Sequence, residues 1–165
     1  MTDDRRQILR LRSGQATDRP SVPDSKIVVH QANPDRTIVE EQIRATVARV
    51  VEGEGFVIQE LSIVLADNAT VHELNREWLG HDYETDVVSF SLDEAALADR
   101  RIDGEIYVDL DTAAERAPDF GASFEAETLR YVLHGLLHLM GHDDATEGQR
   151  SAMRALEDRY LDMAT

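Results

Sequence analysis

Three histidines and two aspartates fall within the eleven residues from His134 to Asp144. His134 and His138 are four positions apart, so on a helix their side chains lie one turn apart on the same side. Two imidazoles at this spacing can bind a single metal ion. Gly141 is a typical helix terminator, and His142 and Asp144 follow it as candidate third ligands. The stretch therefore predicts a metal site on a helix.

The helix that carries the two histidines begins at Ser123, a residue type that favours the N-cap, and Glu125 suits the positive end of the helix dipole. Its apolar residues recur at the spacing of one helix face, and they are Leu129, Val132, Leu133, Leu136, Leu137 and Met140. His134 and His138 project away from the centre of this face. We therefore expect the apolar face to pack on a core while the histidines point into a cleft.

The composition bounds the class of protein. A chain of 165 residues with 42% hydrophobic residues is long enough for one domain with its own core. We expect residues 1–25, which contain several arginines and two prolines, to form a disordered arm, and residues 26–165 to form the domain. No apolar run reaches membrane-spanning length and the start does not resemble a signal peptide, so we expect a cytoplasmic protein without membrane contact. The absence of cysteine excludes disulfides and thiolate metal sites.

The periodicity of the chain predicts an α+β domain, with a small mixed sheet of about four strands and helices packed over it. The expected strands are 26–31, 60–65, 87–92 and 105–108. A capping box at Thr37–Glu40 opens a helix that runs to Gly53, and a second helix passes through Val71 and Trp78. Residues 93–103 are expected to be an acidic connection. Further helices are predicted at 111–117, at the histidine pair, and from a second capping box at Thr146–Gln149 to about residue 162.

A formal net charge of −16 opposes the binding of nucleic acid, because a phosphate backbone is attracted by basic surfaces. Lys26 is the only lysine, and every other cationic side chain is an arginine. Local charge would have to outweigh the overall repulsion, which is easiest at high salt, where screening lengths shrink to a few Å.

The histidine stretch, His-Gly-Leu-Leu-His-Leu-Met-Gly, resembles that of the YbeY family of metal-dependent endoribonucleases, which carry His-Gly-x-Leu-His-Leu-x-Gly. A second block supports the resemblance: Leu-Asn-x-x-Trp at 74–78 and Thr-Asp-Val-Val-Ser-Phe at 85–90, in the order found in the family. Two departures stand out. The family's third histidine, ten residues after the first, is Asp144 here, and an arginine common in the family is replaced by Leu79. Arg76, one turn earlier, is either a substitute for it or an ordinary surface residue.

The resemblance implies a zinc-dependent, single-strand endoribonuclease that acts in ribosomal RNA maturation and ribosome quality control. Its partners would be a ribosomal RNA precursor and the small ribosomal subunit, with no DNA. The family register favours His134, His138 and Asp144 as the ligands of one Zn²⁺ per chain, with His142 as the alternative third ligand. His134, Asp86 and Asn75 are the expected catalytic residues.

A zinc ion with three protein ligands lowers the pKa of its bound water to about 7, which would suit attack on a phosphodiester. Asp143 and Asp86 are the candidates for the general base. One alternative is a zincin-like metalloprotease, but the glutamate of its His-Glu-x-x-His motif is replaced by Gly135. Another is a non-catalytic metal-binding factor that assists ribosome assembly.

Overall fold

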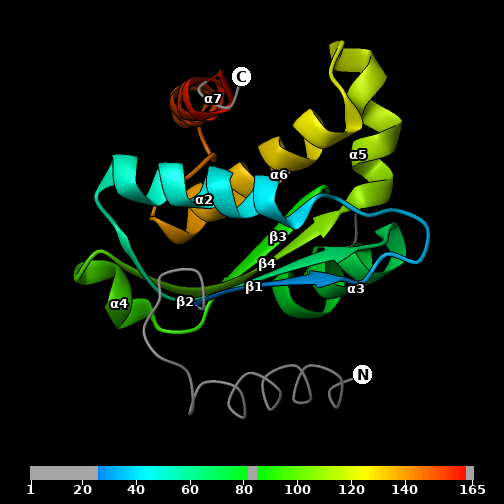
Figure 1. Ribbon diagram of the computed structural model, residues 1–165. Coiled ribbons are helices and arrows are strands. Elements are labelled where there is room, and N and C mark those ends of the chain that lie inside the picture. Colours follow the sequence, from blue (N-terminus) through cyan, green and yellow to red (C-terminus); the bar gives the residue numbers. More distant parts are fainter. Residues whose placement is uncertain (1–25, 82–84, 163–165) are drawn as a thin grey trace.

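The computed structural model describes residues 26–81 and 85–162, so the predicted N-terminal arm, residues 82–84 and the last three residues lie outside the described part. Its centre is a four-stranded mixed sheet with the spatial order β1-β2-β4-β3 (Figure 1). β2 pairs in parallel with both β1 and β4, and β3 pairs antiparallel with β4 at the edge. The strands are β1 (Ile27–Gln31), β2 (Val57–Ala66), β3 (Val87–Ser91) and β4 (Arg101–Asp109).

Helices cover the sheet on both faces, with α2 and α6 on one face and α3 on the other (Figure 1). α7 packs against α6 and α2 on the side away from the sheet. The helices are α2 (Glu40–Glu54), α3 (Asn68–Leu79), α4 (Glu94–Ala98), α5 (Leu110–Arg116) with the 3₁₀ turn Ala117–Phe120, α6 (Phe124–Leu139) and α7 (Glu147–Asp162). This arrangement confirms the predicted α+β domain with a small mixed sheet.

The alternation of side chains along β4 separates two cores. Ile106 and Val108 belong to the larger cluster, which is shared with α2, α6 and α7. Tyr107 points to the opposite face and packs in a small cluster with Phe90 and Val71 of α3. Successive residues of a strand point to opposite faces of the sheet, so β4 contributes side chains to the core shared with α6 and also to the small cluster shared with α3.

Two predicted helix boundaries are confirmed by their hydrogen bonds. The Ser123 hydroxyl accepts from the backbone N–H of Ala126 at 3.1 Å and caps α6. At the start of α7, the Gln149 N–H donates to the Thr146 hydroxyl at 3.1 Å, while the Gln149 side chain accepts from the Thr146 N–H at 2.9 Å. This reciprocal pair is the capping box that the sequence predicted.

The predicted boundaries of α2 are wrong at both ends. The N-cap is Val39, without a side-chain hydrogen bond, and the Gln31 amide binds the backbone of Ile38 in place of a capping box. The helix continues through Gly53 to Glu54, and its C-cap is Gly55, whose φ of 73° suits glycine. Gly53 is needed inside the helix because the Tyr160 ring occupies the space of a side chain there.

Two other expectations also need correction. The acidic connection 93–103 contains the short helix α4, and the first residues of β4 also come from it. The Asp93 side chain caps α4 by accepting from the Ala95 N–H at 3.1 Å. Trp78, an apolar residue of the kind usually found in a core, is 42% exposed near the end of α3.

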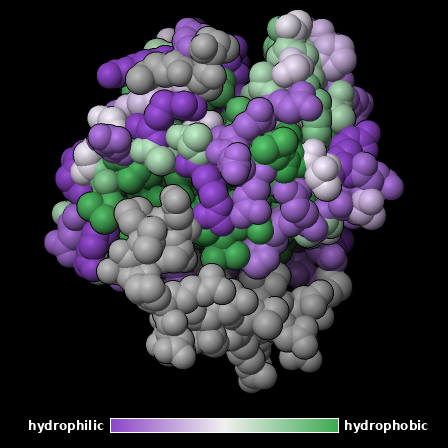
Figure 2. Space-filling view, viewed as in Figure 1, coloured by the Kyte–Doolittle hydropathy of each residue, from purple (hydrophilic) through white to green (hydrophobic). Residues whose placement is uncertain are grey.

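The face of the molecule in Figure 2 is mostly hydrophilic in its described part, with apolar side chains in separate patches. This matches amphipathic helices that direct their apolar faces inward. Within residues 26–81 and 85–162, the helices lack the combination of length and hydrophobicity that a bilayer-spanning segment needs.

Candidate metal centre

The position of α6 on the sheet decides where its histidines point. Gly135 faces the sheet so closely that an added Cβ would lie 2.8 Å from Ile106 and 3.1 Å from Val87. Its neighbour His134, and His138 one turn later, are rotated away from this contact and are only partly buried. The two rings meet edge to face, with 4.7 Å between centroids, and their Nε2 atoms lie 3.1 Å apart.

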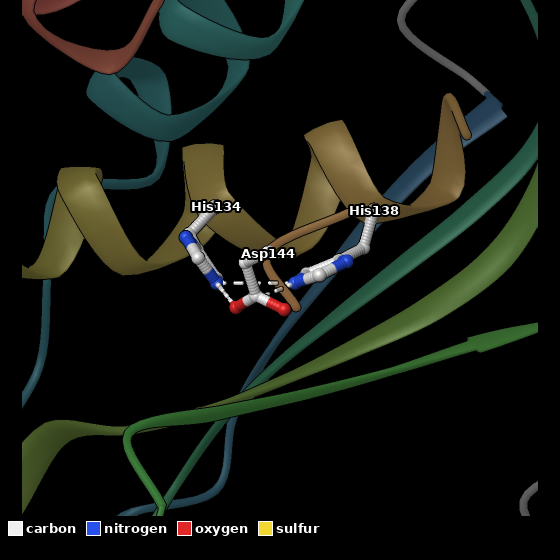
Figure 3. A group of neighbouring side chains, drawn as sticks. All are labelled: His134, His138 and Asp144. Atoms are coloured by element: carbon white, nitrogen blue, oxygen red, sulfur yellow. Dashed lines mark hydrogen bonds and ion pairs between the residues drawn. The ribbon is translucent and has the colours of Figure 1, made fainter. Parts of the chain in front are cut away.

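A tight turn after α6 brings back the third side chain. The helix ends at Leu139, and Gly141 adopts a φ of 94° that reverses the chain. The Gly141 N–H donates to the His138 carbonyl at 3.0 Å, which closes the turn. The Asp144 carboxylate then points back at the histidines, with Oδ2 at 3.3 Å from Nε2 of His134 and 3.4 Å from Nε2 of His138 (Figure 3).

His142, the alternative third ligand, points elsewhere. Its Nε2 lies 3.9 Å from the Glu54 carboxylate at the end of α2. Its backbone carbonyl, however, accepts a hydrogen bond from Nδ1 of His138 at 3.1 Å. Of the two candidates, Asp144 is the one whose side chain gathers with the histidine pair, and these three residues form a group that could hold a metal ion.

The spacing of the three ligand atoms fits a zinc-sized ion. Tetrahedral zinc binds imidazole nitrogen and carboxylate oxygen at about 2.0–2.2 Å, which places any two ligand atoms about 3.3 Å apart. The separations here are 3.1, 3.3 and 3.4 Å. The three atoms can therefore reach one ion with their side chains as they stand.

The hydrogen bonds of the two Nδ1 atoms show which nitrogen of each histidine ring is left to bind a metal. Nδ1 of His134 lies 3.2 Å from a Glu157 carboxylate oxygen, and Nδ1 of His138 faces the carbonyl of His142. Ionised carboxylate and carbonyl oxygens only accept hydrogen bonds, so each Nδ1 is the donor. The Nε2 atoms of the neutral rings then carry lone pairs that converge with the Asp144 carboxylate, an arrangement that favours a bound cation.

The electrostatic field at the centre favours a cation. Burial lowers the pKa of His134, but the hydrogen bond with Glu157 and the charges of Glu157, Asp86 and Asp144 outweigh it, and the pKa is raised from 6.5. The same field that holds a proton on the ring attracts a metal ion to it.

Asp86 lies at the start of β3, beside α6. Its charge acts on His134 and also on Tyr131, whose pKa is raised by burial and by Asp86 and Glu127. Its backbone carbonyl accepts from the Asp109 N–H at 2.9 Å, which fixes this end of β3 on β4. Among the predicted catalytic residues, Asp86 is therefore close enough to act electrostatically on the candidate centre.

Asn75 lies on α3, which covers the opposite face of the sheet from α6 (Figure 1). It is buried, and its carbonyl accepts the N–H groups of Gly80 and His81 at the end of the helix. Its expected catalytic role stays a prediction. Arg76 forms an exposed pair with Glu73 at 3.4 Å, as an ordinary surface arginine does.

Sequence reasoning missed Glu157, which contacts His134 from α7, 23 residues further along the chain. One signal was present in the sequence. Glu157 occupies the buried stripe of α7 together with Met153 and Tyr160, at the spacing of a helix face. A carboxylate in an apolar stripe indicates a buried partner.

Comparison with known proteins agrees with the fold and shows the family of the chain. The family model for the endoribonuclease YbeY matches residues 28–165, and the chain belongs to this family of endoribonucleases, hydrolases that act on RNA. The curated endoribonuclease YbeY of Salinibacter ruber is 46% identical over 147 residues, covering 86% of this chain and 93% of its own. That of Chlorobaculum tepidum is 40% identical over 130 residues, covering 78% and 92%. The solution structure of a Thermotoga maritima protein has a TM-score of 0.60 at 27% identity and covers 84% of this chain and 88% of its own.

Proposed function

We propose that this protein is a zinc-dependent endoribonuclease that cleaves single-stranded RNA in the cytoplasm and takes part in ribosomal RNA maturation and ribosome quality control. Its natural substrate would be a precursor of ribosomal RNA, met on the small ribosomal subunit. Membership of the endoribonuclease family supports RNA cleavage. The observation that carries the zinc dependence is the convergence of two imidazole nitrogens and one carboxylate oxygen within 3.4 Å of one another.

In this mechanism His134, His138 and Asp144 would hold the metal ion, and a bound zinc would act as a Lewis acid that lowers the pKa of a coordinated water to about 7. The Glu157 carboxylate and the carbonyl of His142 accept hydrogen bonds from the two Nδ1 atoms, which leaves both Nε2 atoms free to bind a metal. Asp86 is the proposed general base; this assignment is supported by the packing of β3 against α6 and by the charge of Asp86, which acts on His134.

The structure gives a physical argument against a zincin-like protease. In that class a glutamate follows the first histidine and activates water. Here the corresponding residue, Gly135, is turned to the sheet and away from the histidine pair, and even a methyl group would meet Ile106 at 2.8 Å. A glutamate at this position would need the helix to move off the sheet.

The proposal is tested with the full-length protein on a single-stranded RNA and on a small-subunit ribosomal RNA precursor, with zinc and with a chelator. We expect cleavage that requires zinc and is abolished by His134→Ala without loss of folding. His30→Ala, on the exposed edge strand β1, is the matched control and should remain active. Cleavage that survives both the chelator and His134→Ala would contradict the proposal. Zinc retention without RNA cleavage would favour the non-catalytic assembly factor, and zinc-dependent hydrolysis of casein would favour the protease.

A further inference from the structure

Glu157 is a charged residue in a buried position. It lies on the face of α7 that packs towards the rest of the domain, and only 6% of the residue is exposed. Burying a carboxylate is costly unless charged or hydrogen-bonding partners compensate for the lost hydration. The identity of its partners therefore indicates why a glutamate is placed there.

The two carboxylate oxygens of Glu157 have different partners. Oε1 accepts from Nη1 of Arg130 at 3.3 Å, and the same guanidinium donates to Asp158 at 2.7 Å. Oε2 faces Nδ1 of His134 at 3.2 Å. Arg130 and His134 are four residues apart on α6, so one glutamate of α7 spans one turn of the metal-bearing helix. The arginine compensates the charge and leaves the other oxygen directed at the imidazole.

The second histidine is held in a different way. Nδ1 of His138 donates to the backbone carbonyl of His142 in the turn after α6, so its orientation is fixed locally. His134 has no such local backbone partner among its described contacts, and its Nδ1 depends on a side chain of another helix. One ligand is oriented by the turn and the other by the docking of α7.

We propose that Glu157 is a positioning residue of the metal centre: from α7 it fixes the ring of His134 with Nδ1 protonated and Nε2 free, and its charge makes Nε2 a better metal donor. Arg130 holds the glutamate in this place. A carboxylate behind a histidine ligand orients the ring and raises its basicity. The inference rests on the proposed metal centre, but its first test does not need the metal.

The first experiment uses long-range ¹H–¹⁵N correlation spectra of the metal-free full-length protein, at a pH where the histidines are neutral. In the wild type we expect His134 and His138 to carry the proton on Nδ1. Glu157→Leu should shift His134 towards the Nε2-protonated form and leave His138 unchanged, because the carbonyl of His142 remains. A merely structural role for Glu157 would not move the tautomer of one histidine selectively. An unchanged His134 spectrum in the folded variant would overturn the inference.

The second experiment measures zinc affinity by competition with a chromophoric chelator. Loss of an outer-shell carboxylate should weaken zinc binding by about 10–100-fold in Glu157→Leu, and by less in Glu157→Gln, whose carbonyl can still accept the hydrogen bond. Asp158→Asn is the matched control, since Asp158 shares Arg130 but does not touch His134. Its zinc affinity should stay near that of the wild type.

The outcomes distinguish a failure of the proposed zinc-dependent function from a failure of the positioning role of Glu157. If the wild type binds no zinc, the proposed function fails, and the tautomer of His134 still decides the role of Glu157. If the wild type binds zinc and both Glu157 variants bind it equally well, the metal centre stands and Glu157 is not a positioning residue. Should Glu157→Leu fail to fold, Glu157→Met, which keeps the length of the side chain and also lacks the acceptor, carries both measurements.

Discussion

The two faces of the sheet use polar residues in opposite ways. On the α3 face, buried and half-buried polar groups bind one another: the Tyr107 hydroxyl donates to Glu105 at 3.1 Å, and Asp109 accepts from Thr112 at 2.7 Å and from the half-buried Asn68 at 2.8 Å. On the α6 face, the polar groups of the candidate centre converge instead, with acceptor atoms directed at one another. Closed hydrogen bonds indicate a structural role, whereas converging acceptors indicate a ligand.

This comparison predicts that changes on the α6 side can remove metal binding and leave the fold intact. The largest expected effect is that of Asp144→Asn. Loss of an outer-shell partner alone costs about 10–100-fold in metal affinity, so loss of a ligand carboxylate should cost more than about 100-fold. Zinc affinity is measured by chelator competition, and circular dichroism checks the fold.

His142→Ala is the matched control for Asp144→Asn, because it removes the alternative ligand and keeps the backbone carbonyl that orients His138. Its zinc affinity should be nearly unchanged, and Asp144→His should restore what Asp144→Asn loses. If His142→Ala alone releases zinc, the side chain of His142 must leave Glu54 to bind the metal, and Asp144 is not the third ligand.

The contact between α6 and the sheet predicts a second, smaller effect. A methyl group at Gly135 meets Ile106 and Val87, so Gly135→Ala should destabilise the domain by about 1–3 kcal/mol through overpacking. The higher helix propensity of alanine should offset roughly 1 kcal/mol of this loss. Urea unfolding in the presence of chelator measures this without a contribution from metal binding.

Gly148→Ala on α7 gives the matched comparison, because nothing lies within 4 Å of a Cβ at that position. Only helix propensity should act there, so this variant should be as stable as the wild type or more stable. If Gly135→Ala and Gly148→Ala change the free energy of unfolding equally, α6 does not pack tightly on the sheet at Gly135.

The sequence predicted those features that local physics determines. The period of the apolar residues located the sheet and α6, and capping chemistry located the starts of α6 and α7 at Ser123 and Thr146. The i, i+4 spacing brought His134 and His138 together, and the turn at Gly141 gave room for Asp144 to return. Each of these depends on residues within about ten positions of one another.

The features that sequence reasoning missed depend on contacts between distant segments. Gln31 of β1, not Thr37, binds the backbone ahead of α2, and Glu157 reaches His134 from another helix. Trp78 has the residue type of a core position, yet it lies near the end of α3, where the small cluster on that face does not extend to cover it. Hydrophobicity predicts burial only where another element is present to bury the side chain.

The smallest predicted effect lies on the α3 side and tests the other half of the comparison. Asp67 caps α3, accepting from the Thr70 N–H at 2.9 Å, and hydrogen bonds from the Thr70 side chain and backbone lower the pKa of Asp67 from 3.8. Asp67→Ala should cost about 1 kcal/mol of stability near neutral pH and leave zinc affinity unchanged. Because the pKa is lower in the folded state, this stabilisation is present above about pH 4 and is lost as the pH falls through the folded pKa.

Urea unfolding is measured from pH 7 downward. The difference in free energy of unfolding between Asp67→Ala and the wild type should therefore become smaller towards acid pH. Asp67→Asn keeps the acceptor oxygen, so its difference from the wild type should be smaller and should vary less with pH. A difference that stays constant with pH would mean that the charge of Asp67 does not contribute, and a loss of zinc affinity would mean that the two faces of the sheet are coupled.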